Sequence, residues 1–206
     1  MSEDPKQEYF SDGITEDLIT DLSKISGLFV VARNSTFTYK GKPVDVKKVG
    51  EDLGVIYVLE GSVRKADEKV RVNAQLIDAS TGLHLWAERF DGTFGDIFSL
   101  QDKFTRKIVA ALSLKLTTDE QEKLTLRYTD NVEAYDAYLK GQLQLNLGTR
   151  DGLVSAVSFF EKAIELDSDY RLAHAGLSIT YQKSVERAWY KELGWADARS
   201  RSQRHI

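Results

Sequence analysis

Three strand-like segments joined by two short turns place the strongest constraint on the fold of this chain. They cover residues 56–65, 69–78 and 83–90. In the middle segment apolar and polar residues alternate, so one face is expected to be buried and the other polar. The connecting turns at 66–68 and 79–82 are too short for a crossover between parallel strands. The sequence therefore predicts an antiparallel meander.

Helical patterns flank the meander. Apolar residues at helical spacing predict a helix from about residue 12 to Gly27, a short helix after Asp45, and a long one over 96–116. The continuous apolar run 28–32 predicts a strand that is covered on both faces.

These elements together predict an α+β domain over residues 1–118. Its helices are expected to pack on a mixed sheet built from the 28–32 strand and the meander. Beyond it, we interpret 119–130 as a linker. No strand pattern follows, and three helical patterns, at 131–147, 151–166 and 171–187, predict a separate all-α domain over 131–206.

Composition limits the classes of function. The 28 basic and 32 acidic residues give a net charge of −4, so the uniformly basic surface of a nucleic-acid-binding protein is not expected. No apolar run is long enough for a membrane span within this chain. The absence of cysteine excludes disulfides and thiolate chemistry, and the three histidines are far apart in the sequence. The scattered glycines form no phosphate-binding loop. We therefore expect no catalytic residues, no metal site and no cofactor.

The helical part contains a spaced set of small and aromatic residues. The set comprises Gly141, Ala156, Phe160, Ala163, Leu177 and Tyr181. It resembles the tetratricopeptide repeat, in which small residues allow paired helices to approach closely and a large aromatic residue fills the groove between them. The chain departs from that pattern by three extra residues before Ala156 and by Ser168 in place of the usual proline. The resemblance covers about one and a half repeats and implies a surface that binds a peptide or protein; the alternative is an ordinary helical hairpin.

The first part of the chain carries six motifs in one order, at 8–22, 31–35, 39–42, 58–63, 74–78 and 85–89. Together they resemble the TolB-N-like domain, and the resemblance covers about residues 4 to 128. Such domains occur in bacterial signalling proteins, downstream of a class III adenylate/guanylate cyclase domain or a CadC-type winged-helix domain and before tetratricopeptide repeats. An apolar strand usually precedes the motif that begins at Glu8, so we expect this chain to be a fragment that lacks the first strand.

Two groups of residues are candidate binding sites. Arg33, Asn34 and Ser35 follow the expected 28–32 strand and suit a small-molecule ligand loop; the alternative, which we favour, is a turn whose side chains hydrogen-bond their own backbone. Arg71 and Gln75 lie on the expected polar face of the meander and are candidates for docking another domain. Trp86 joins them as an interface candidate only if it shares their face.

The function expected from these observations is a non-catalytic sensory or protein-interaction module of a larger bacterial signalling protein. The repeats would bind a peptide or protein partner, and the chain has the potential to form a homo-oligomer. The alternative is a small-molecule sensor with a pocket near Arg33–Ser35. The family resemblance implies the periplasmic side of an inner-membrane protein; without it, the chain is expected to be cytoplasmic.

Overall fold

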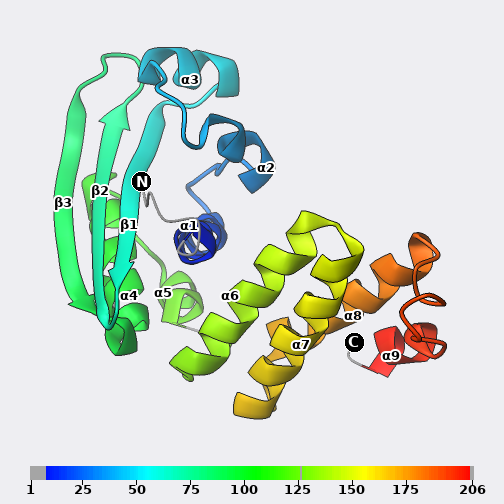
Figure 1. Cartoon of the computed structure of the whole chain (residues 1–206). Coiled ribbons are helices and arrows are strands. Elements are labelled where there is room, and N and C mark those ends of the chain that lie inside the picture. Colours follow the sequence, from blue (N-terminus) through cyan, green and yellow to red (C-terminus); the bar gives the residue numbers. More distant parts are fainter. Residues whose placement is uncertain (1–7, 126, 205–206) are drawn as a thin grey trace. The chain divides into compact units, whose positions relative to one another are not determined.

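The computed structural model describes residues 8–125 and 127–204, and the chain divides into two compact units, Met1–Leu126 and Arg127–Ile206 (Figure 1). The first unit combines helices with an antiparallel sheet, and the described residues of the second form helices joined by turns, without a strand. The predicted α+β class with a helical C-terminal region is therefore confirmed. None of the helices described combines the length and hydrophobicity that a bilayer crossing requires.

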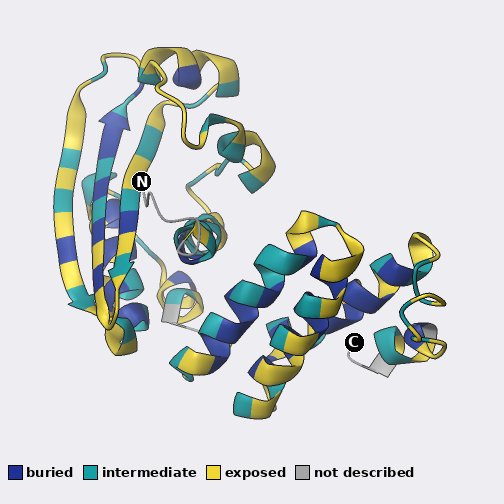
Figure 2. Ribbon diagram, viewed as in Figure 1, coloured by how far each residue is buried: buried dark blue, intermediate teal, exposed yellow. Residues whose placement is uncertain are grey.

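The sheet of the first unit is the predicted meander. Its strands are β1 (Tyr57–Ala66), β2 (Lys69–Asp78) and β3 (His84–Thr93), in the order β1-β2-β3. β1 and β2 pair continuously over ten residues each, whereas the pairing of β2 with β3 is interrupted between Leu76 and Ile77. Strand alternation is visible as alternating buried and exposed bands along β2 (Figure 2).

Two helices cover one face of this sheet. α1 (Glu8–Ser23) packs on β1 and on α4 (Ile97–Ala111), and α4 packs on β2 and β3. Apolar side chains from the sheet and from the two helices form the core, because a strand and an amphipathic helix each bury one apolar face. Its members include Phe10, Ile14, Val70, Val72, Leu76, Phe90, Phe104 and Ile108.

α3 (Val46–Leu53) has the start and the stop that its sequence predicts. The Asp45 side chain accepts a hydrogen bond from the Lys47 amide at 2.9 Å, which satisfies a free donor at the helix start. Gly54 ends the helix in the left-handed conformation, with φ of 65°.

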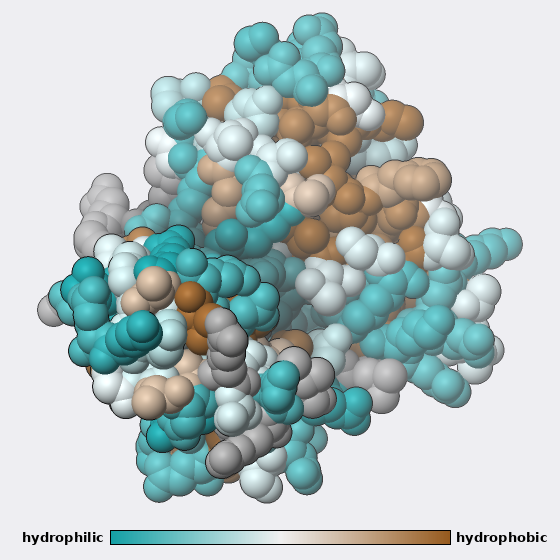
Figure 3. Space-filling view, turned by 90° about the vertical axis from the view of Figure 1, so that its right-hand side faces the viewer, coloured by the Kyte–Doolittle hydropathy of each residue, from teal (hydrophilic) through white to brown (hydrophobic). Residues whose placement is uncertain are grey.

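The strand predicted at 28–32 is wrong, and with it the mixed sheet. Among the described residues these five pair with no strand, and the sheet is antiparallel throughout. Phe29 is 99% exposed, so the run is not covered on both faces. Apolar side chains gather in a patch at the upper right of Figure 3, and the exposed apolar residues of this unit include Phe29, Ile56 and Tyr57. A continuous apolar run indicates burial but cannot specify the strand with which it pairs.

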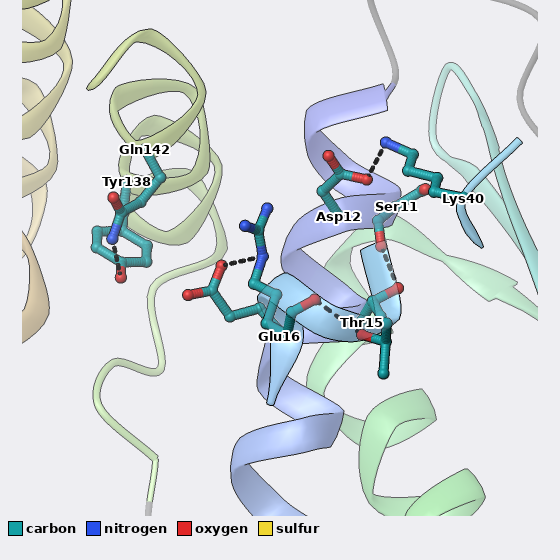
Figure 4. Close-up of polar contacts among 9 residues, drawn as sticks. Ser11, Asp12, Thr15, Glu16, Lys40, Tyr138 and Gln142 are labelled. Carbon is teal, nitrogen blue, oxygen red and sulfur yellow. Dashed lines mark hydrogen bonds and ion pairs between the residues drawn. The ribbon is translucent and has the colours of Figure 1, made fainter. Parts of the chain in front are cut away.

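Short helical turns follow the 28–32 segment. α2 (Arg33–Thr36) and the 3₁₀ turn η2 (Phe37–Tyr39) are held to α1 by ion pairs. Lys40 Nζ contacts Asp12 (Figure 4) and lies 2.6 Å from Glu8, and Arg33 Nε lies 3.3 Å from Glu16. The acidic side chains along α1 therefore position this segment.

The first unit ends with a second 3₁₀ turn, η3 (Phe94–Asp96), before α4, and with α5 (Thr118–Thr125). α5 lies in the segment predicted as a linker. Glu120 of α5 is buried and accepts hydrogen bonds from both the amide and the hydroxyl of Ser26 and of Thr117. These bonds tie α5 to the turn that follows α1.

The second unit contains α6 (Val132–Leu147), α7 (Arg150–Leu166), α8 (Arg171–Glu186) and α9 (Ala198–Arg204). α6 packs against both α7 and α8, and α9 packs on α8. Gly148 ends α6 with φ of 63°, and Thr149 begins α7 by accepting a hydrogen bond from the Gly152 amide at 3.0 Å. This tight turn makes α6 and α7 an antiparallel pair.

Candidate functional site

Phe160 joins three successive helices of the second unit. It lies on α7 and is completely buried. A Cβ atom added at Gly141 of α6 would lie 2.7 Å from its ring, and one added at Gly176 of α8 would lie 2.6 Å from it. Real Cβ contacts are never this short, so the ring requires glycine on both neighbouring helices. The α6–α7 hairpin is therefore packed on the following helix through one aromatic ring.

The other residues predicted for repeat packing are also brought into this core. Ala156 and Ala163 of α7 have no exposed surface, and Leu177 and Tyr181 of α8 are 2% and 1% exposed. Small residues at these places let the helix backbones approach, while the larger ones fill the space between them. All six residues are thus buried in the helical unit, and their role in repeat packing stays a prediction.

Two tyrosines that the sequence reasoning did not single out complete the aromatic core. The Tyr138 ring lies 5.9 Å from Phe160 and 5.2 Å from Tyr170, centroid to centroid. The Gln142 amide donates to the Tyr138 hydroxyl at 2.7 Å, which satisfies its polar end (Figure 4). Gly176 was missed as well; its signal in the sequence is its position three residues after Ala173, which places two small residues on one helix face.

Asn131 connects the two ends of the α6–α7 hairpin. Its side-chain oxygen accepts from the Ala134 amide at 2.9 Å and begins α6. Its side-chain nitrogen donates to the Leu166 carbonyl at 3.1 Å, at the end of α7. One side chain thus satisfies a free donor and a free acceptor at neighbouring helix ends.

The segment after α8 folds back onto the same unit. Trp195 contacts the Tyr181 ring edge-on at 5.3 Å, and Arg201 of α9 donates to the Tyr181 hydroxyl at 3.2 Å. The hydrogen bond that Arg201 donates to Asp197 raises the pKa of Arg201 above its ordinary value. Trp189 lies beside the guanidinium groups of Arg150 and Arg187. The aromatic residues at this end therefore pack within the unit.

One face of α8 consists of solvent-exposed residues. Arg171, Ala175, Ile179 and Gln182 recur at helical spacing and are all exposed, and we name them the α8 stripe. Ile179 is 43% exposed in the middle of this stripe. An apolar side chain among polar neighbours on a rigid helix is a suitable anchor for a protein partner.

The candidate ligand residues Arg33, Asn34 and Ser35 lie on α2. The Arg33 guanidinium stacks on the Phe37 ring at 3.9 Å and pairs with Glu16, so it contributes to the packing of its own unit. Asn34 and Ser35 are exposed, and the Ser35 carbonyl accepts from the Thr38 hydroxyl at 2.7 Å. These residues form a helical turn, and the structure gives them mainly local partners.

The candidate interface residues are on different faces of the sheet. Arg71 and Gln75 share one face of β2, whereas Trp86 pairs with Leu76 and therefore lies on the opposite face. The Trp86 ring is 6.0 Å from buried Phe90, and its Nε1 donates to Glu88. Trp86 thus belongs to the edge of the core.

The carboxylates of α1 have partners of their own. Gln101 donates to Asp17 at 3.1 Å, and Lys24 to Asp21 at 2.8 Å. Among residues 8–125 and 127–204 no three His, Cys, Asp or Glu side chains are grouped closely enough to hold a metal ion.

Comparison with known proteins gives one informative similarity. The chain is similar to "Putative adenylate cyclase 3" of Rhizobium meliloti (strain 1021), with 52% identity over 179 residues. The aligned region is 87% of this chain and 30% of the relative, so the chain spans less than a third of the curated protein that it matches. No protein-family model matches the sequence.

Proposed function

We propose that this chain is a non-catalytic sensory and protein-interaction region of a larger bacterial signalling protein associated with adenylate cyclase. In this proposal a peptide or protein partner binds the helical unit. The observation that carries it is the Phe160 ring enclosed by Gly141 and Gly176, because this contact stacks a helix pair on the next helix. Stacked helix pairs form the extended binding surfaces of helical-repeat proteins.

The similarity to a protein named as an adenylate cyclase supports the signalling part of the proposal. Only 30% of that relative is matched, and we assign cyclase chemistry to parts of such proteins outside the matched region. The 206-residue chain incubated with ATP and Mg²⁺ or Mn²⁺ is then expected to form no cyclic AMP. Sustained cyclic AMP formation by the purified chain would overturn the non-catalytic assignment.

Site-directed photo-crosslinking tests the interaction part. A crosslinking amino acid is placed at Ala175 or Gln182 of the α8 stripe, and at exposed Lys48 or Glu51 of α3 as matched controls. In cells of the native host, we expect one discrete protein adduct from the α8 positions and none from α3. Adducts from α3 alone would contradict binding through the helical unit.

A further inference from the structure

The face of the sheet opposite α1 and α4 carries mainly charged and polar side chains. Strand alternation and register place Glu60, Ser62 and Arg64 of β1 on it, and they face Gln75, Asn73 and Arg71 of β2. Arg89 and Asp91 of β3 complete the set, and we name these eight residues the open sheet face. All five of its charged side chains are exposed.

This face is basic although the chain is acidic. It carries three arginines against Glu60 and Asp91, whereas the chain as a whole has a net charge of −4. Arg64 and Arg71 lie directly opposite each other on β1 and β2. Like charges at directly opposed positions destabilise a sheet. The two opposed arginines therefore reduce the stability of the sheet locally, and an anionic ligand bound beside them would offset this loss.

Only one of the three arginines, Arg71, forms an ion pair within the face, although Arg89 also lies close enough to Asp91 to help lower its pKa. Arg71 pairs with Asp91, and this hydrogen bond raises the pKa of Arg71 and lowers that of Asp91. Arg89 donates to the Asn73 amide oxygen at 3.3 Å, which is a neutral acceptor. Arg64 has no carboxylate partner among the described residues. Arg64 on β1 and Arg89 on β3 thus lack an ion pair, and their backbone positions are about 12 Å apart, two strand spacings across the sheet and two residues along it.

The side chains on this face favour one class of anionic partner over others. Proteins bind single-stranded nucleic acid with aromatic side chains on which the bases stack. Because Trp86 lies on the other face of the sheet, nucleic acid is the less suitable ligand. A membrane surface favours apolar side chains that insert beside the cations, and the centre of this face is Ser62 and Asn73, bonded to each other at 3.1 Å. Carboxylates, like phosphates, match exposed guanidinium forks, and a polypeptide supplies carboxylates without modification.

We propose that the open sheet face binds an acidic segment of a partner protein, with Arg64 and Arg89 as its two contacting cations. This surface is separate from the helical unit, so the inference stands independently of the function proposed above. The α+β unit then has a protein partner of its own, which it recognises by carboxylates spaced along the acidic segment.

Fluorescence anisotropy at low ionic strength tests this inference on the full 206-residue chain. The probe is a labelled octaglutamate peptide; labelled oligothymidine and phosphatidylglycerol vesicles are compared with it. The test variant is Arg64→Gln/Arg89→Gln. Its matched control is Lys103→Gln/Arg106→Gln, which removes two exposed charges from α4 of the same unit.

We expect the Arg64→Gln/Arg89→Gln variant to bind octaglutamate about fivefold more weakly than wild type, because exposed ion pairs are individually weak. The α4 variant should bind like wild type. An equal loss of octaglutamate affinity in the two variants would show unspecific electrostatic attraction and overturn the proposal. No measurable binding of octaglutamate would also overturn it, as would tighter binding of oligothymidine or vesicles through the same arginines.

Discussion

Glu120 connects segments that are nearly a hundred residues apart. Its carboxylate accepts from the Ser26 amide and hydroxyl at 2.7 and 2.6 Å, and from the Thr117 amide and hydroxyl at 2.8 and 2.9 Å. The Ser26 hydroxyl is the largest of the causes that lower the pKa of Glu120 to about 2. Hydrogen bonds to the charged form stabilise it, and the same bonds fasten α5 to the first unit.

This depressed pKa predicts a pH-dependent contribution to stability. Because the folded pKa lies below the ordinary value of 4.5, the contribution is complete above about pH 4.5 and is lost as the pH falls toward 2. We expect Glu120→Gln to lower the urea midpoint at pH 7, with the difference from wild type shrinking between pH 4.5 and 2. Glu51→Gln, at an exposed position of α3, serves as the control. A midpoint difference that stays constant with pH would contradict the account.

The close approach of the Phe160 ring to Gly176 leads to a second prediction at the residue scale. Alanine has the higher helix propensity by about 1 kcal/mol, yet its Cβ would lie 2.6 Å from the ring. We expect Gly176→Ala to destabilise the second unit by about 1–3 kcal/mol, measured by chemical denaturation. Phe160→Leu should lower the free energy of unfolding less in the Gly176→Ala variant than it does in wild type. Stabilisation by Gly176→Ala alone would show that the ring has room to move.

At the scale of elements, Asn131 determines how the α6–α7 hairpin closes. Its side chain bonds both the Ala134 amide and the Leu166 carbonyl. We expect Asn131→Ala to cost about 1–2 kcal/mol, because one free donor and one free acceptor are left. Asn131→Ser keeps a side-chain oxygen that can cap the Ala134 amide and removes the donor to Leu166, so it should cost less. Equal denaturation midpoints for the two variants would contradict the double role.

The sequence predicted most helices and all three paired strands, because their patterns are local. Alternation in 69–78, the Asp45 and Gly54 boundaries of α3, and the helical spacing in the second unit each depend on neighbours within a few residues. The strand predicted at 28–32 was wrong because strand pairing depends on a distant partner. The short α2 and η2 turns were missed because their position depends on ion pairs with α1.

For the molecule as a whole, the candidate sites differ in how far sequence could predict them. The six repeat-packing residues could be named because spacing on a helix determines which side chains share a face. Gly176 and Tyr138 were missed because their importance depends on contacts between helices. The face of Trp86 was left undecided because it depends on the register with β2, which includes an irregularity beside Leu76.

The central claim is that a protein partner binds the helical unit, and the most direct measurement is calorimetric titration with the partner identified by crosslinking. The variant Ile179→Arg changes the exposed apolar residue of the α8 stripe, and Val44→Arg changes a similarly exposed residue of the first unit. We predict that Ile179→Arg weakens binding about tenfold, because a central apolar anchor typically contributes more than 1 kcal/mol, and that Val44→Arg binds like wild type. Unchanged affinity for Ile179→Arg together with weakened binding by Val44→Arg would contradict the claim.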